Sequence, residues 1–144
     1  MKKFELTENY KICFGRKLFQ IRALVSIKNV VEEGEVGGYI EKEENLSQFG
    51  NSWVSDNAQV FGNARVRGNS RVTENAQVFG NARVTGNSLV TENARVSGNA
   101  FVTGNSCVTE NARVSGNAFV AGNSCVLGND HVHGDVLLIS DVSL

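Results

Sequence analysis

The chain has no proline, only three cysteines and no long hydrophobic run among its 144 residues. None of its apolar stretches approaches the roughly 18 residues that a membrane-spanning helix needs, so we expect no contact with a membrane. Lys and Arg number 14 and nearly balance the 15 Asp and Glu, and charged residues make up 20% of the chain. This balance argues against a highly charged disordered chain and against a generally basic nucleic-acid binder. We therefore expect neither a membrane nor a nucleic acid among its partners.

Cysteine usage indicates a cytoplasmic protein. Cys13, Cys107 and Cys125 are an odd number, and no apolar segment with a cleavage site precedes them. A secreted disulfide scaffold usually has an even number of cysteines after such a segment. The length fits one domain with its own core. We expect a single cytoplasmic unit.

An excess of Asn, Val and Gly is concentrated in a repeat. From residue 45 to residue 134 the chain consists of fifteen six-residue units, or hexads, without an insertion, and Asn opens each of them. The second place is Ala or Ser except at Leu46 and Asp130, the fourth is Val except at Gln48, and the sixth is Gly or an acid. Alternation of small apolar with polar places predicts a short strand with one buried face. Gly followed by Asn favours a turn with positive φ, so each hexad should be a strand and a corner.

The sequence also repeats with a longer period of three hexads. Ser recurs at the second place of every third hexad, and acids recur with the same spacing at the sixth place, at Asp56, Glu74, Glu92 and Glu110. Three hexads therefore make one coil of an all-β parallel solenoid. Each residue should stack on the equivalent residue three hexads later, at the inter-strand distance of roughly 4.8 Å. The interior should be a dry column of Val with Ala or Ser.

The repeated V-x-G-N-A-x pattern, as in VFGNARVRGNSRV and VSGNAFVTGNSCV, resembles the hexapeptide-repeat left-handed β-helix superfamily. It is most similar to short phage and prophage members described as polymer-forming or acyltransferase-like proteins, and the segment 21–58 resembles their N-terminal region. The resemblance implies a left-handed parallel β-helix, although the general rule for parallel crossovers favours the right hand. One departure is that Gly follows the aliphatic residue by two places here, whereas in the enzymes of the superfamily it often follows directly.

The sequence divides into three segments. Residues 1–44 contain short apolar, β-branched stretches, with a hairpin expected through Phe14, Gly15 and Arg16, and we interpret them as a small N-terminal β cap over open strand edges. Residues 45–134 form the hexapeptide-repeat β-helix. Residues 135–144 continue the pattern imperfectly and are interpreted as a C-terminal cap or oligomer contact.

One outward face is apolar in its C-terminal half. The third and fifth places of each hexad should point outward, and at those places four residues stack into a stripe: Phe101, Phe119, Leu137 and Ile139. A contiguous exposed apolar stripe usually marks a partner surface. We interpret it as a homo-oligomer interface, a trimer by analogy with the superfamily or a dimer. The alternative is stacking of like side chains with no partner.

Two charged groups of residues suggest other roles. A basic cluster, with Trp53 nearby, is a candidate anion-binding site, and its alternative is a solvated basic edge: Arg65, Arg67, Arg71 and Arg83. The acid column places like charges about 5 Å apart, which destabilises the fold unless it is compensated. We expect Arg95 and Arg113, three places after Glu92 and Glu110, to pair with them. A bound cation is the alternative, but one carboxylate per coil supplies few oxygen ligands.

His131 and His133 are the candidate metal ligands and lie on one strand. The superfamily resemblance implies comparison with its carbonic anhydrases, which bind zinc with three histidines from two subunits, whereas this chain has two histidines in all. Neutral imidazoles on an exposed last coil are more often polar surface residues than metal ligands. We expect no metal and no other cofactor.

The sequence favours a non-catalytic structural or binding protein that self-associates and presents rigid faces to a partner. An acyltransferase-like enzyme acting at a subunit seam is the first alternative. In that case the resemblance assigns the role of general base to His131, although fifteen uninterrupted hexads leave no loop to shape a site. The resemblance alone suggests a third reading, a phage factor that inhibits a host protein or sequesters a nucleotide signal.

Overall fold

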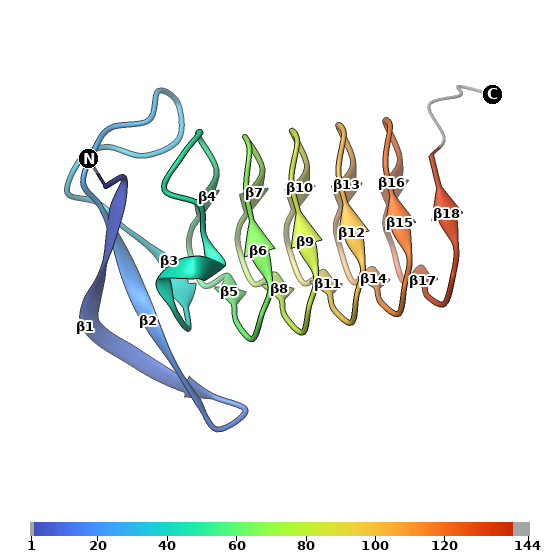
Figure 1. Cartoon of the computed structure of the whole chain (residues 1–144), viewed down its shortest axis with the longest axis horizontal. Coiled ribbons are helices and arrows are strands. Elements are labelled where there is room, and N and C mark those ends of the chain that lie inside the picture. Colours follow the sequence, from blue (N-terminus) through green and yellow to red (C-terminus); the bar gives the residue numbers. More distant parts are fainter. Residues whose placement is uncertain (1, 140–144) are drawn as a thin grey trace.

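A computed structural model describes residues 2–139 of the chain. Three longer strands and one 3₁₀ turn precede a regular series of two-residue strands (Figure 1). The N-terminal elements are β1 (Phe4–Cys13), β2 (Arg16–Ala23), β3 (Val36–Ile40) and the 3₁₀ turn η1 (Glu43–Asn45). The series consists of β4 (Trp53–Val54), β5 (Gln59–Val60), β6 (Arg65–Val66), β7 (Arg71–Val72), β8 (Gln77–Val78), β9 (Arg83–Val84), β10 (Leu89–Val90), β11 (Arg95–Val96), β12 (Phe101–Val102), β13 (Cys107–Val108), β14 (Arg113–Val114), β15 (Phe119–Val120), β16 (Cys125–Val126), β17 (His131–Val132) and β18 (Leu137–Leu138).

The hexads wind into a parallel β-solenoid in which every coil consists of three hexads and contributes one strand to each of three sheets. Val60 pairs with Val78 and Val78 with Val96, and the other two sheets repeat this register. The sheets run in the orders β5-β8-β11-β14-β17, β4-β7-β10-β13-β16 and β6-β9-β12-β15-β18. The predicted all-β solenoid and its coil of three hexads are thereby confirmed. The left hand of the winding stays a prediction.

Corners of the solenoid depend on positive φ at the sixth place of the hexad. Gly86, for example, has φ of 71°, and a Cβ built on it would lie 2.7 Å from the carbonyl oxygen of Gly104 on the next coil. Most side chains would therefore clash at such a corner, in addition to the unfavourable backbone conformation. The adjacent Asn side chains form ladders along the corners, as where the Nδ2 of Asn81 donates to the Oδ1 of Asn99 at 3.1 Å. Corners that bring backbones this close explain why Gly and Asn recur in every coil.

The interior is a dry column of small side chains. The inward Val residues are fully buried through Val126, and the second-place Ala and Ser line the same column. A buried hydroxyl needs a hydrogen-bond partner. Ser106 satisfies this need by donating to the carbonyl oxygen of Thr103 at 2.7 Å, and Ser70 and Ser88 make the same bond three residues back. Serine therefore replaces alanine in the core without leaving its hydroxyl unpaired.

The N-terminal segment extends one of the three sheets past the first coil. β1 and β2 form an antiparallel hairpin whose turn is Phe14–Gly15, as expected from the sequence, and both turn residues have positive φ. β2 pairs with β3, and β3 pairs in parallel with β5, so the sheet order is β1-β2-β3-β5 and onward (Figure 1). This pairing covers the N-terminal edge of that sheet.

Close packing also seals the N-terminal end against the neighbouring sheet. Gly37 leaves no room for a side chain, because a Cβ built there would lie 2.5 Å from the carbonyl oxygen of Val54. The buried ammonium group of Lys3 donates to the carbonyl oxygen of Ser52 at 2.7 Å. Desolvation by burial lowers the pKa of Lys3 from 10.5 to about 8.

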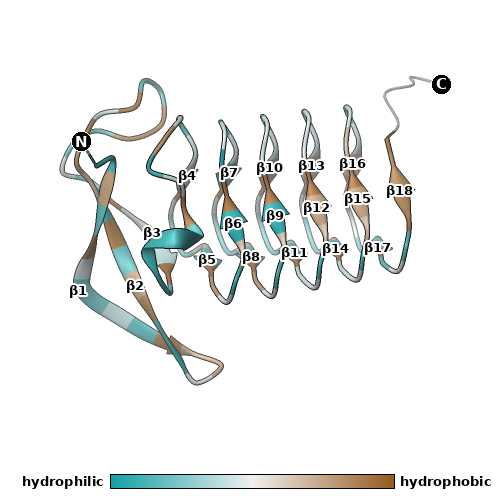
Figure 2. Cartoon of the chain, in the orientation of Figure 1, coloured by the Kyte–Doolittle hydropathy of each residue, from teal (hydrophilic) through white to brown (hydrophobic). Residues whose placement is uncertain are grey.

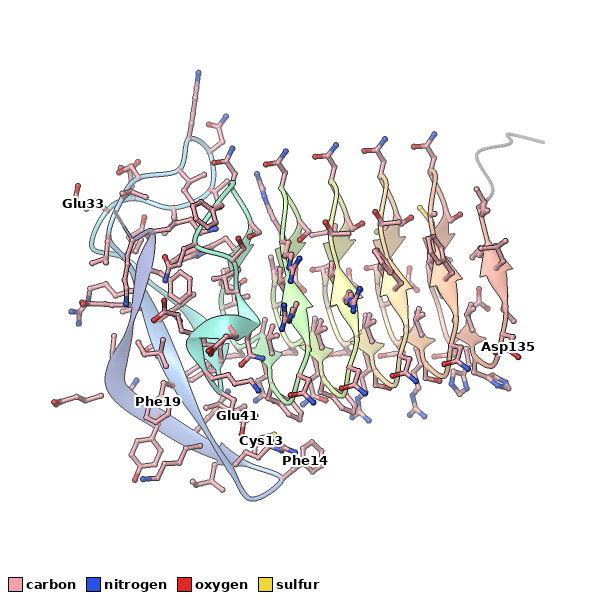
Figure 3. All side chains as sticks on the ribbon, viewed as in Figure 1. Cys13, Phe14, Phe19, Glu33, Glu41 and Asp135 are labelled. Carbon is pink, nitrogen blue, oxygen red and sulfur yellow. The ribbon has the colours of Figure 1, made fainter. Side chains whose placement is uncertain are left out.

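Two aromatic residues expected to point into solvent are buried by this segment. Trp53 is only 2% exposed and meets the ring of Phe4 edge-on at 6.5 Å, and Phe61 is 4% exposed. Phe61 lies between Phe14 of the hairpin tip and Phe79 of the next coil. The expectation was wrong because the covering residues come from the hairpin, which lies far upstream in the sequence and outside the repeat. Figure 3 shows Phe14 and Cys13 at the tip of this hairpin.

At the other end, β16, β17 and β18 are each the last strand of their sheet. The core opens there, since Val132 and Leu138 are only partly buried. Residues 140–144, part of the segment interpreted as a C-terminal cap or oligomer contact, lie outside the described residues. Within residues 2–139, no helix is long and apolar enough to cross a membrane.

Candidate interaction surface

Each sheet of the solenoid turns one flat face outward, and we name the three by their side chains. The aromatic face is the outer side of β6-β9-β12-β15-β18. The histidine face is the outer side of the sheet that ends in β17, and the threonine face is the outer side of the sheet that ends in β16. Because equivalent residues of successive coils are in register, every outward position forms a straight column along the solenoid.

The stripe predicted from the sequence lies in the C-terminal half of the aromatic face. The rings of Phe101 and Phe119 stack at a centroid distance of 5.1 Å and an interplanar angle of 19°. Leu137 is in register with Phe119 and is 62% exposed, and Ile139 is 51% exposed. The apolar side chains therefore form one surface that becomes more exposed toward the C-terminal end.

The N-terminal half of the same face is basic. Arg65 and Arg83 are in register on adjacent strands, and Phe101 follows Arg83 directly. Figure 2 shows this change of character, with β6 and β9 hydrophilic and β12, β15 and β18 hydrophobic. Within residues 2–139, the ion pairs are confined to the N-terminal segment and involve neither arginine. Two like charges directly opposite each other destabilise a sheet unless something offsets them.

An open cleft of about 530 Å³ borders this basic half at the capped end of the solenoid. Arg65 and Arg67 line one side of it, and Leu46 and Phe49 supply its apolar part. Glu43 and Glu44 also line the cleft, and Glu43 is paired with Lys2 at 3.0 Å. Phe49 is 85% exposed, the most exposed of the large apolar side chains described. Phe49 carries no signal in the repeat pattern, because the first hexad, residues 45–50, departs from it.

The basic cluster predicted from the sequence is split between two faces. Arg65, Arg67 and Arg83 belong to the aromatic face, whereas Arg71 lies on β7 of the threonine face. Arg71 lines a separate shallow cleft of about 360 Å³ with Leu89. Three of the four candidate anion-binding residues therefore share one surface.

The third-place column of the histidine face is polar along its length, with Gln, Arg and His side chains. Gln77 donates through Nε2 to Gln59 at 2.9 Å, and the Cys13 thiol donates to the same Gln59 oxygen at 3.2 Å. At the far end, a ring nitrogen of His131 lies 3.1 Å from the hydroxyl of Ser115, and the His131 and His133 rings are 4.6 Å apart. Among residues 2–139 no three His, Cys, Asp or Glu side chains come together as a metal site. His131, the candidate general base, lies exposed on the last complete coil of this face.

The acid column occupies corners where the other two corners of each coil have glycine. Glu74, Glu92 and Glu110 have φ between 58° and 60°, a left-handed conformation unusual for a side chain with a Cβ. In the described part of the chain, no ion pair joins Glu92 or Glu110 to Arg95 or Arg113, so the expected compensation was wrong. Oε2 of Glu110 reaches instead toward Gly128 on the next coil, and the charge of Glu92 acts on Cys107.

Cysteines of the threonine face are thiols without a disulfide. Cys107 and Cys125 are in register on adjacent strands, and both are free. Burial raises the pKa of the Cys107 thiol, and the neighbouring Cys125 and Glu92 add to this. A raised pKa disfavours the thiolate, which is the reactive form. Cys107 therefore has the character of a packed thiol and lacks that of a nucleophile.

Comparison with known families finds the repeat unit. A family described as the YdcK beta solenoid repeat matches the chain three times, over residues 58–74, 76–92 and 94–110. Successive matches begin at positions 58, 76 and 94, so each match is one coil further along the solenoid. No curated protein matches the chain. The chain is thus similar to a β-solenoid repeat protein in the middle of its solenoid.

Proposed function

We propose that this protein is a non-catalytic structural and binding protein that self-associates and presents rigid faces. The observation that supports this most is the stripe of Phe101, Phe119, Leu137 and Ile139 on one flat face. Fully burying one such side chain contributes about 1.5–3 kcal/mol, so covering four of them can offset much of the entropy lost on association. A folded scaffold with parallel ladders holds this surface without rearrangement, which lowers the cost of binding further.

We also propose the finer classification that the repeat implies. Fifteen hexads without an insertion favour a member of the hexapeptide-repeat left-handed β-helix superfamily, and the segment 21–58 favours the phage type. Cys107 and Cys125 lie side by side as thiols, which supports a reducing compartment such as the cytoplasm.

The experiment is a measurement of mass by light scattering at tens of micromolar protein. We expect the wild type to be an oligomer and the double variant Phe101→Glu, Phe119→Glu to be a folded monomer. The matched control is Ser97→Glu with Ser115→Glu, which adds the same two charges to the histidine face and should leave the oligomer intact. A monomeric wild type, or an oligomer that survives the two Phe substitutions, would contradict the proposal.

A further inference from the structure

Side chains along the aromatic face change from basic to apolar, and this order favours one relative orientation of two paired copies over the other. Its third-place column has five members, with two cations at one end, a phenylalanine in the middle and two apolar residues at the other end: Arg65, Arg83, Phe101, Phe119 and Leu137. β12 is the central strand of its sheet, with two strands on each side. We call each strand of this sheet with its outward side chains a rung. A twofold axis that passes Phe101 and runs along the strands would therefore place each rung of one copy against a rung of the other.

We propose that two copies associate through their aromatic faces with the solenoid axes antiparallel. This inference rests on the proposed self-association and assigns its geometry. Arg83 of each copy then lies against Phe119 of the other, Arg65 lies against Leu137, and the two Phe101 side chains meet at the axis. The match continues along the whole face because both copies have the same spacing between coils.

Cations facing aromatic rings are the attractive element of this arrangement. A guanidinium over a Phe ring is attracted by the ring quadrupole, more strongly when the pair is desolvated, and the twofold axis repeats the contact. Arg65 and Arg83 make no ion pair with any residue from 2 to 139, so their guanidinium groups are available for such contacts. The arginine heads that repel each other within one copy thus gain a partner in the second.

A parallel arrangement gives the opposite result. With parallel axes, as in a cyclic trimer whose axis follows the solenoid, rungs of equal height meet. In a parallel dimer Arg65 then faces Arg65 and Arg83 faces Arg83, which places four like charges in a desolvated interface, and a trimer with this face on its axis brings six together. The exposed stripe alone does not choose between dimer and trimer. The basic half of the face favours the antiparallel dimer.

The cleft at the capped end also fits this geometry. Arg65 and Arg67 form one wall of it, and Leu46 and Phe49 form its apolar part. The antiparallel dimer brings Leu137 and Ile139 of the second copy to the rung of Arg65 and Arg67. Phe49, one coil before Arg67, would then lie next to Leu137 and Ile139 of the second copy at both ends of the interface.

Cross-linking between single cysteines tests the geometry directly. The background variant has Cys13, Cys107 and Cys125 replaced by serine and must retain the wild-type mass. In the fifth-place column, Thr85 lies one rung before Thr103 and Ala121 one rung after it. Antiparallel pairing therefore brings residue 85 of one copy to residue 121 of the other. We expect a short bismaleimide linker to join Thr85→Cys to Ala121→Cys when the two variants are mixed, and to join little of either variant alone. Thr103→Cys, at the centre, should cross-link with itself.

The other outcomes separate this inference from the proposed function. Cross-linking of Thr85→Cys and Ala121→Cys each with itself would overturn the antiparallel geometry while self-association stands. An oligomer in which Thr103→Cys fails to cross-link would place the contact elsewhere and overturn it as well. A monomeric wild type would overturn both proposals.

Substitution of the cation gives an independent readout. Arg83 is exposed, so its replacement should not affect folding. We expect Arg83→Gln to raise the dimer dissociation constant about 10-fold to 100-fold, since it removes two contacts, and Arg83→Lys to raise it less because a cation remains. Tighter association of Arg83→Gln would contradict the proposal, because it would mean that the arginines meet each other.

Discussion

The two ends of the solenoid differ in how well the core is buried. At the N-terminal end, β3 adds to the sheet of β5, and Ile40 and Val60 are fully buried. At the C-terminal end, Val132 and Leu138 occupy equivalent inward places and are only partly buried. The repeat therefore supplies a core for every coil that has a neighbour on both sides. It cannot close its own end, and the N-terminal closure depends on sequence outside the repeat.

The open end carries charge in places that the repeat reserves for neutral residues. Asp130 takes the inward second place that Ala58, Ala76, Ala94 and Ala112 occupy in the coils before it. Asp135 takes the corner place of Asn117 and accepts a hydrogen bond from it at 3.1 Å (Figure 3). A charge at an inward place of an exposed edge, as at Asp130, discourages further strands from pairing there. One end is thus covered by structure and the other is protected by charge.

The largest expected effect is the loss of stability when an inward Val becomes Asp, and this loss should differ between the two ends of one column. Val60, Val96 and Val132 lie in the same inward column of one sheet. Val60→Asp and Val96→Asp should prevent folding, since an unpaired carboxylate in a dry core costs several kcal/mol. Val132→Asp should lower the melting temperature only slightly. Thermal unfolding by circular dichroism measures all three, with outward Ser97→Asp as the control. Equal losses at Val60 and Val132 would remove the distinction between the ends.

Glycine substitutions give the next largest contrast. Gly37→Ala introduces a Cβ 2.5 Å from the carbonyl oxygen of Val54 and 2.9 Å from Ile21 and Trp53. We expect it to lose about 1–3 kcal/mol in denaturant unfolding, the usual range for overpacking. Gly134 has φ of 77° but nothing within 4 Å of its added Cβ. Gly134→Ala should therefore cost only about 1 kcal/mol, from its left-handed conformation. The reverse order would indicate that the capped end is loosely packed.

The pH dependence of stability should report the buried Lys3. Its pKa is about 8 in the fold and 10.5 when unperturbed. Between these values the unfolded chain binds more protons, so stability should rise with pH, by roughly 1 kcal/mol per pH unit at most. Below pH 8 both states are protonated and the contribution of Lys3 should be constant. Lys3→Met should flatten the rise. A slope unchanged by Lys3→Met would assign the pH dependence to other groups.

The smallest expected effect is a gain at the open end. Asp130→Ala restores the inward alanine of the preceding coils, and because residue 130 is exposed we expect only about 0.5 kcal/mol or less of added stability. The same variant should associate end to end at high concentration, because the inward charge no longer protects the strand edges. Sedimentation velocity would detect such species. Asp130→Asn, which removes the charge and keeps the shape, should show the same tendency more weakly, and the absence of both effects would mean that Asp130 has no protective role.

The regular part of the fold was predictable because it depends on local periodicity. Burial of Val96 and stacking of Phe101 on Phe119 follow from the hexad and the three-hexad period alone. Burial of Trp53 does not, because the covering ring of Phe4 lies far upstream and outside the repeat. Lys3 carries no sequence signal at all, since a lysine near a terminus is ordinarily exposed.

The sequence predicts which residues of the candidate surface share a column, but it predicts their side-chain contacts less well. Counting by three hexads places Arg65, Arg83 and Phe101 on one face, and the structure places them in register. The spacing alone does not show which neighbour each corner acid contacts, and the expected pairing of Glu92 with Arg95 is wrong. Nor does it give the cleft beside Phe49, because this depends on how the first, irregular hexad joins the solenoid.

Small-angle X-ray scattering combined with light scattering tests the central claim, that two copies associate side by side through their aromatic faces and leave both ends free. We predict a particle of twice the chain mass whose longest dimension exceeds that of the monomeric Phe101→Glu, Phe119→Glu variant by less than half. A particle of the chain mass, or one of twice the mass and nearly twice the length, would contradict it.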